Sequence, residues 1–159
     1  MRKVLSAIFV ACMLALLSVL SIPAVRASPV TNAEGTLAWL VVNFEGTRTA
    51  GINTIYQGTS TIAAGGTFTG DVTDAWVEVW HAMKFLNLRD VLTFTGKVDG
   101  KSGTLTIRLV GIATLPDIVW TSGQWEIMRG TGDLANLQGQ GTWWGTGNNV
   151  EYSGLIQFE

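Results

Sequence analysis

Cysteine and histidine are almost absent from this chain. Among 159 residues, Cys12 is the only cysteine and His81 is the only histidine. Cys12 lies inside an apolar segment near the amino terminus, so the rest of the chain has no thiol for a disulfide, a nucleophile or a metal ligand. One imidazole also excludes a metal site built from several histidines. We therefore expect no metal and no cofactor, and we expect an ordinary packed core to supply the stability.

Charged residues are also scarce. They make up 14% of the chain, and the formal net charge is −2. Three of the ten basic residues, Arg2, Lys3 and Arg26, lie in the amino-terminal segment, so the remainder of the chain is more acidic than the total suggests. A protein of this charge repels polyanions, and we expect no nucleic-acid partner.

The chain has one long apolar run, VLSAIFVACMLALLSVLSI, directly after Arg2-Lys3. The run is followed by Ala-Val-Arg-Ala at positions 24–27, which is typical of a signal-peptide cleavage site. We interpret residues 1–27 as a signal peptide and residues 28–159 as one domain. This interpretation predicts a secreted or periplasmic protein with no stable membrane insertion after cleavage. The alternative is an uncleaved membrane anchor, because the run approaches the length of a membrane span.

The remainder reads as an all-β domain. Threonine, valine, isoleucine and aromatic residues form short runs that glycine, asparagine and aspartate separate, and helix signals are few. About eight strands are predicted, at a spacing typical of an antiparallel β-barrel or sandwich. They fall at residues 36–44, within 52–69, and at 75–81, 91–98, 103–110, 123–129, 139–144 and 150–158.

Two joints are predicted to be hairpin turns and one segment resists a strand assignment. Residues 99–102 and 145–149 offer glycine, asparagine and aspartate, which tolerate the backbone of tight turns and make the neighbouring strands antiparallel. Residues 81–88, HAMKFLNL, lack alternation and contain helix formers. We expect a helical turn or a lid-like loop there.

Residues 130–141, GTGDLANLQGQG, match the G-x-G-x-x-A pattern of a dinucleotide-binding loop. That mechanism needs a helix whose amino terminus faces the phosphates, and here glycines and Trp-Trp follow before three helical turns could form. We therefore interpret Gly130 and Gly132 as a sheet corner followed by a short turn. Leu134 and Leu137 are then expected to plug one end of a barrel.

Four segments carry a family resemblance: FTGD at 68–71, DGKSGTLTI at 99–107, residues 130–141, and YSGLIQF at 152–158. Together they resemble bacterial families of unknown function in the allene oxide cyclase barrel superfamily, over roughly residues 66–159. The resemblance implies an eight-stranded antiparallel barrel with a mostly apolar interior, akin to allene oxide cyclase, dirigent proteins and polyketide barrel cyclases. It implies no particular reaction and no catalytic residue, and it suggests that copies of the chain associate as a homo-oligomer.

Candidate site residues come first from the strand at 75–81. Trp76, Glu78 and Trp80 share one face of that strand, so either both faces are covered or an acidic side chain points into a cavity. A carboxyl desolvated by two indoles would have a raised pKa and could act as a general acid, which makes Glu78 the catalytic candidate. The opposite orientation, with Glu78 in solvent, is equally compatible with the pattern. We expect Trp76, Trp80, Trp125 and Tyr152 to line the ligand-binding lumen.

Three functions fit these features, and the residues leave open whether the protein is an enzyme. The first is binding of a small hydrophobic molecule in the barrel lumen. The second is a cyclase or isomerase that confines a flexible substrate, with Glu78 assisting. The third is a cell-surface module that binds carbohydrate or protein through exposed tryptophans, since Trp143 and Trp144 cannot both face inward. His81 is more typical of a structural hydrogen bond than of a catalytic base.

Overall fold

The computed structural model describes residues 28–116 and 120–159, and the predicted signal peptide at residues 1–27 lies outside them. The described residues form eight strands. They are β1 (Thr31–Ala50), β2 (Asn53–Gly66), β3 (Phe68–His81), β4 (Phe85–Val98), β5 (Lys101–Thr114), β6 (Thr121–Gly132), β7 (Leu137–Thr146) and β8 (Asn149–Phe158). No helix among these residues is long and apolar enough to cross a membrane.

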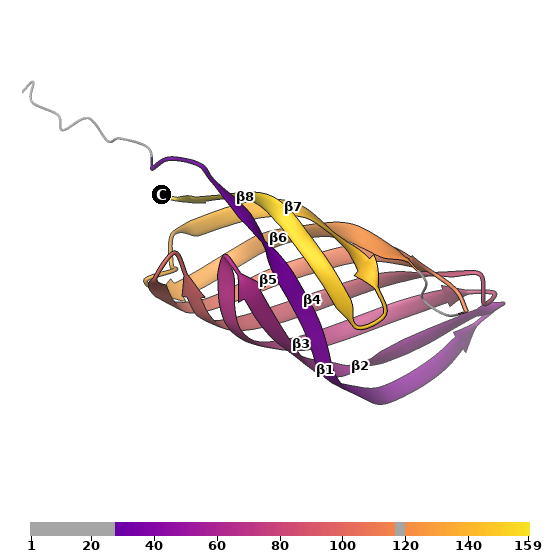
Figure 1. The fold of residues 1–159 in the computed structure, drawn as a ribbon. Helices are drawn as coiled ribbons and strands as arrows, with labels where there is room; N and C mark the ends of the chain where they lie inside the picture. Colours follow the sequence, from indigo (N-terminus) through magenta and orange to yellow (C-terminus); the bar gives the residue numbers. More distant parts are fainter. Residues whose placement is uncertain (1–27, 117–119) are drawn as a thin grey trace, which may run out of the picture.

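Each strand pairs antiparallel with its neighbours in sequence, and β8 returns to pair with β1. The sheet is therefore a closed barrel, which Figure 1 shows from the side. This arrangement confirms the prediction of an all-β fold with about eight antiparallel strands. Closure joins the first strand to the last and leaves most strand edges paired.

Tight turns connect the long strands. Asp99 and Gly100 form the two-residue turn between β4 and β5, with positive φ angles of 50° and 78° that suit an Asp-Gly hairpin. The prediction of a helical turn or lid at residues 81–88 is wrong. Ala82 and Met83 adopt positive φ, and β4 begins at Phe85. The alternation was hidden because Phe85, an apolar side chain, lies on the exposed face of its strand.

One end of the barrel is closed by side chains. Leu134 and Leu137, from the turn after β6 and the start of β7, are 0% and 2% exposed and belong to the core cluster, as the sequence predicted for a plug. Behind them, Phe68 packs edge-on against Phe94 and Trp125, with ring centroids 5.8 Å apart in both pairs. A cavity of only about 30 Å³ remains in this half.

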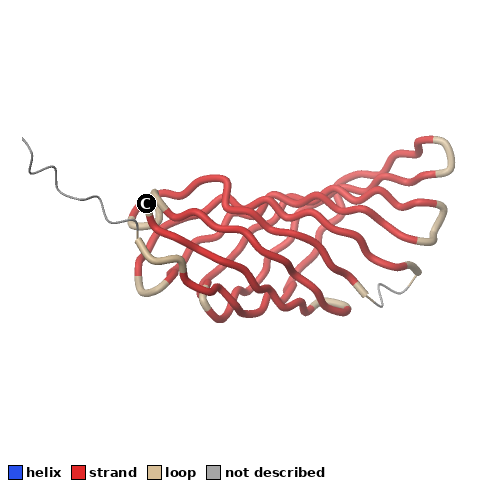
Figure 2. The backbone as a smooth tube through the Cα atoms, turned by 90° about the horizontal axis from the view of Figure 1, so that it is seen from above, coloured by secondary structure: helices blue, strands red, loops and turns tan. Residues whose placement is uncertain are grey.

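The other end is less complete, because β7 and β8 are the shortest strands. Pairing of β1 with β8 stops at Ala38, and the Trp39 amide makes one more backbone hydrogen bond, to the Asn148 carbonyl at 2.9 Å. Beyond this point β1 continues to Ala50 paired only with β2. Figures 1 and 2 show these first strands extending past the β7–β8 turn.

Candidate functional site

A pocket of about 330 Å³ occupies the less complete end of the barrel. It is lined mainly by residues of β1, β3 and β4, with single residues from β5, β6 and β8 and two from the turn between β7 and β8. The lining residues are Trp39, Val42, Phe44, Asp74, Trp76, Glu78, Trp80, Leu86, Leu88, Asp90, Ala113, Thr121, Gly147, Asn148 and Val150. Most of them are aromatic or aliphatic, with a few polar groups among them.

Strand β3 supplies the largest share of the polar lining, and its orientation settles a question that the sequence left open. Trp76 is 6% exposed whereas its neighbour Val77 is 41% exposed, so the face that carries Trp76, Glu78 and Trp80 points into the barrel. Asp74 lies on the same face and is 3% exposed. The expected lining residues Trp76, Glu78 and Trp80 therefore lie together in the pocket.

Strand β4 adds Asp90, which is buried and lies opposite Trp76 in the register. Asp74 and Glu78 are the diagonal neighbours of Asp90 across the strand pair, close enough for their side chains to interact. Sequence reasoning missed both aspartates. Alternation along β4 could have indicated Asp90, because it shares a face with Leu88, Leu92 and Phe94 that is otherwise apolar.

Only one of the two carboxyl oxygens of Asp74 has a hydrogen-bond partner among the described residues. Its Oδ2 accepts a hydrogen bond of 2.8 Å from the Ser60 hydroxyl, while its Oδ1 has no partner among the described residues. Burial raises the pKa of Asp74 to about 6, and the hydrogen bond from Ser60 and the nearby side chain of Trp39 only partly offset this effect. This carboxyl can therefore gain or lose a proton close to neutral pH.

Asp90 is the more strongly perturbed carboxyl. Burial, followed by the negative charges of Asp74 and Glu78, raises its pKa to about 9. Its Oδ1 has no hydrogen-bond partner in the described part of the chain. Asp90 therefore holds its proton at neutral pH and presents a neutral acid beside ionisable neighbours.

Glu78 is held by a neighbouring indole. Its Oε2 accepts a hydrogen bond of 2.7 Å from Trp80 Nε1. Burial raises the pKa of Glu78, and this hydrogen bond lowers it by a smaller amount. The indole nitrogen of Trp76, by contrast, is buried and finds no hydrogen-bond partner among the described residues.

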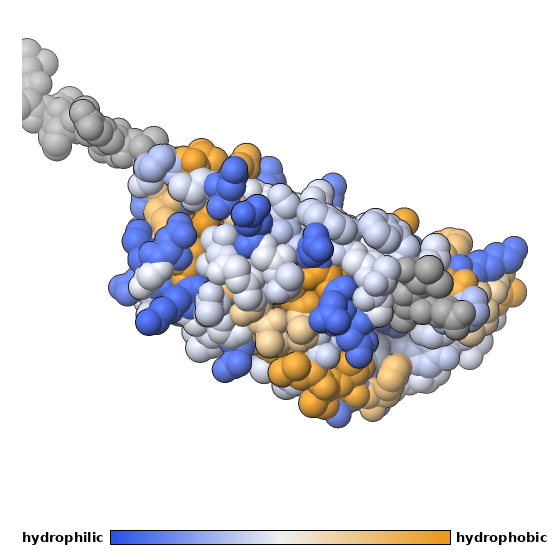
Figure 3. Space-filling view, viewed as in Figure 1, coloured by the Kyte–Doolittle hydropathy of each residue, from blue (hydrophilic) through white to orange (hydrophobic). Residues whose placement is uncertain are grey.

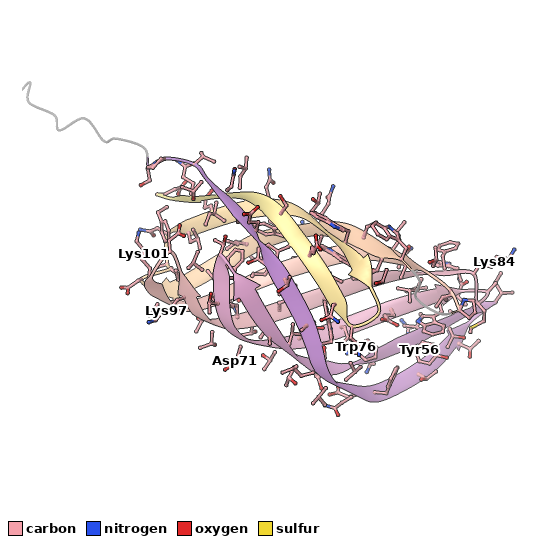
Figure 4. The ribbon with its side chains drawn as sticks, in the orientation of Figure 1. Tyr56, Asp71, Trp76, Lys84, Lys97 and Lys101 are labelled. Atoms are coloured by element: carbon pink, nitrogen blue, oxygen red, sulfur yellow. The ribbon has the colours of Figure 1, made fainter. Side chains whose placement is uncertain are left out.

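Aromatic rings form one wall of the pocket. Phe44 meets Trp76 edge-on at a centroid distance of 5.1 Å, and Tyr56 meets Trp80 at 5.0 Å. Figure 4 places Tyr56 and Trp76 toward the same end of the barrel, far from Lys97 and Lys101 at the plugged end. Such edge contacts hold the rings in fixed positions around the cavity.

The mouth of the pocket is apolar. Val42 and Phe44 line the pocket and are also 45% and 67% exposed, and Leu40 and Val41 beside them are exposed as well. Figure 3 shows this apolar surface over the middle of β1. Register shifts on either side of Val42 and Phe44 interrupt the regular alternation of β1.

Trp125 and Tyr152, which the sequence analysis grouped with the lumen residues, lie outside this pocket. They line the small cavity of the packed half. The Tyr152 hydroxyl donates to the Gly65 carbonyl and accepts from the Phe68 amide, both at 3.0 Å, and Trp125 Nε1 donates to the Ser153 carbonyl at 3.2 Å. Alternation places these rings inside the barrel but does not give their height along its axis.

Of the remaining candidates, Trp143 points inward, whereas Trp144 and His81 lie on the outer surface. Trp143 is 2% exposed and points inward, so Trp144 is the outward member of the pair, near the exposed side chains of Ile112 and Trp120. His81 Nε2 lies 3.3 Å from Asn87 Nδ2, and its ring stacks on Phe85 at 4.5 Å. Among the described residues, no group of three or more histidine, cysteine, aspartate or glutamate side chains is arranged to hold a metal ion.

The fold is similar to a solved structure. A protein of unknown function from the DUF3224 family of Shewanella oneidensis superposes with a TM-score of 0.68, covering 82% of this chain and 98% of that one, at 16% sequence identity. A protein of unknown function from Clostridium acetobutylicum gives a TM-score of 0.48 at 11% identity, over 85% of this chain and 99% of that one. The chain matches no family model and no curated protein. The first similarity shows a shared β-barrel-like fold.

Proposed function

We propose that this protein binds a small, largely apolar molecule in the pocket at the less complete end of the barrel. A volume of about 330 Å³ falls at the lower end of the range for small-molecule sites, roughly 300–1,000 Å³. Aromatic and aliphatic walls with a few convergent polar groups are also typical of such sites. The cavity inside the filled half measures only about 30 Å³.

The observation that carries this proposal is a set of unpartnered polar atoms. Among the described residues, three buried side-chain atoms lack a hydrogen-bond partner: Asp74 Oδ1, Trp76 Nε1 and Asp90 Oδ1. All three residues line the pocket. Because buried polar groups in folded proteins are nearly always hydrogen-bonded, these atoms are poised to meet groups that the chain itself does not supply.

Acid–base catalysis on a confined substrate is the second candidate function. A neutral acid beside an ionisable carboxylate is the combination that proton-transfer enzymes use, and Asp90 with Asp74 provides it. Glu78, with its raised pKa, remains the catalytic candidate that the sequence indicated. A cyclase or isomerase would use both the confinement and these carboxyls.

Other parts of the proposal rest on the sequence. We propose export on the pattern of residues 1–27, and kinship with the allene oxide cyclase barrel superfamily on the four quoted segments, which the eight-stranded fold supports. A surface-binding role would use Trp144 and Trp120 on the outer face. We also propose, on the family resemblance, that copies of the chain associate as a homo-oligomer.

The test of pocket binding is fluorescence titration with the neutral apolar dye N-phenyl-1-naphthylamine. We expect saturable enhancement that Trp80→Ala weakens, because Trp80 forms part of the pocket wall. Val42→Trp, a change at the exposed mouth, should also weaken it by narrowing the entrance. Trp144→Ala, the matched change on the outer face, should leave it unchanged. Equal titrations for all four proteins would place the dye elsewhere and refute the proposal.

A further inference from the structure

We infer that the ligand of this pocket is an organic cation, a protonated amine carried on an apolar body. The inference rests on the proposed function, because it names the chemical class of the molecule that the pocket binds. It comes from the carboxyls that line the cavity and from the carboxyl oxygens that have no hydrogen-bond partner among the described residues.

The charged lining is of one sign. Asp74, Glu78 and Asp90 contribute carboxyls to the cavity, and no lysine, arginine or histidine stands among its described lining residues. The register brings the three together, since Asp90 lies diagonally between Asp74 and Glu78 on the neighbouring strand. Asp90 holds its proton, whereas the ionised forms of Asp74 and Glu78 lie in the cavity without a basic partner, which is costly. A cation from outside the chain is the complement that this cluster lacks.

The unpartnered carboxyl oxygens favour a ligand that donates hydrogen bonds. Asp74 Oδ1 and Asp90 Oδ1 are buried and unpartnered among the described residues, and Ser60 and Trp80 already occupy oxygens of Asp74 and Glu78. An ammonium group offers three N–H donors and can serve more than one carboxylate oxygen. The unpartnered indole nitrogen of Trp76, outside the carboxyl cluster, is independent evidence that the same cavity lacks a hydrogen-bonding partner.

The aromatic wall suits the same ligand class. Phe44, Trp76 and Trp80 surround the cavity with rings whose faces carry partial negative charge, and such rings attract ammonium groups as well as apolar bodies. A neutral ligand would bring no charge to offset that of the carboxylates. An anionic ligand would meet the repulsion of the acidic cluster.

The experiment is calorimetric titration of the protein with three probes that share one apolar body: 2-(naphthalen-1-yl)ethylammonium, 2-(naphthalen-1-yl)ethanol and 3-(naphthalen-1-yl)propanoate. We expect the ammonium to bind at least about tenfold more tightly than the alcohol, because hydrogen bonds between charged groups are stronger than neutral ones. The propanoate should bind most weakly.

Isosteric variants locate the preference. Asp74→Asn should weaken ammonium binding by about tenfold and leave alcohol binding nearly unchanged, whereas Asp90→Asn, which replaces a carboxyl that is protonated at neutral pH, should have a smaller effect. Asp71→Asn is the matched control, because Asp71 is exposed on the outer face of β3, the strand that also carries Asp74, as Figure 4 shows. Should a buried variant fail to fold, Glu78→Gln tests the same cluster at a half-buried position.

The outcomes separate the two proposals. If the alcohol binds as tightly as the ammonium, or if N-phenyl-1-naphthylamine binds and the ammonium does not, the inference of a cationic ligand is overturned and pocket binding stands. If neither the dye nor any of the three probes binds, pocket binding itself fails. Ammonium binding that survives unchanged in every carboxyl variant that folds also overturns the inference, because the cation then lies outside the cluster.

Discussion

Replacing Asp90 by asparagine should stabilise the protein at neutral pH. The pKa of Asp90 rises from 3.8 to about 9 on folding, because of burial and then the charges of Asp74 and Glu78. At pH 7 the carboxyl is ionised in the unfolded chain and protonated in the folded one. Folding must therefore protonate this carboxyl at a pH about 3 units above its unfolded-state pKa, which costs about 4 kcal/mol.

Asparagine has nearly the same shape and no titration, so this cost disappears in Asp90→Asn. Burial of the amide restores part of it, since a buried amide without full hydrogen bonding is itself unfavourable. We expect a net gain in the free energy of unfolding of about 2 kcal/mol at pH 7.

The pH dependence gives the sharper signature. Because the folded-state pKa is raised, the folded protein holds more protons than the unfolded chain between about pH 4 and pH 9. The contribution of Asp90 to stability therefore falls as pH rises through that window, by about 1.4 kcal/mol per pH unit. Asp74, with a pKa of about 6, adds to the decline only up to about pH 6. Above pH 6, Asp90→Asn should therefore show a flatter profile than the wild type.

The assay is urea unfolding followed by tryptophan fluorescence at several pH values from 5 to 8.5. Asp71→Asn, with its exposed position on the outer face of β3, should give the wild-type profile. Identical slopes above pH 6 for wild type and Asp90→Asn would refute the reasoning, because they would mean that Asp90 is not held protonated. A lower stability of Asp90→Asn at pH 8 would refute it as well.

Two further predictions concern the packed half of the barrel. Tyr152→Phe removes a hydroxyl that bonds the Gly65 carbonyl and the Phe68 amide, so chemical denaturation should show a loss of about 1–3 kcal/mol. Dye binding in that variant should be unchanged, and a weakened titration would contradict the separation of the two halves. Gly141→Ala should be more damaging, because its Cβ would overlap the Ser153 carbonyl oxygen and lie 2.6 Å from Trp125 Nε1. A thermal midpoint equal to that of the wild type would contradict this packing.

Much of the fold could be predicted because alternation and turn chemistry are local. Asp99-Gly100 marks a hairpin, and the short run after Gly132 leaves no room for a helix, so both features follow from neighbouring residues alone. Leu134 and Leu137 were identifiable as a plug for the same reason. The prediction for residues 81–88 was wrong because their turn contains no glycine and because the exposed, apolar Phe85 interrupts the alternation that would have indicated β4.

The site was harder to predict, because it depends on depth along the barrel axis and on pairing between strands. Trp125 and Trp76 both point inward, yet one is in the packed half and the other in the pocket. Alternation can place Asp74 and Asp90 on the inward faces of their strands, but only the register makes them diagonal neighbours. A single acidic residue between two tryptophans was visible in the sequence, whereas a cluster across two strands was not.

Pairing between β1 and β8 ends at Ala38, so the two halves of the barrel differ in how β1 is held. In the plugged half β1 pairs on both sides, with β2 and with β8, whereas around the pocket the far part of β1 pairs with β2 alone. The far part of β1 is therefore an edge beside the pocket, while β2 stays paired with β3 from Asn53 onward. If the pocket binds a small molecule as we propose, substitutions around the cavity can change which molecule fits while the packed core of the other half is left untouched, so that one scaffold can be adapted to many ligands.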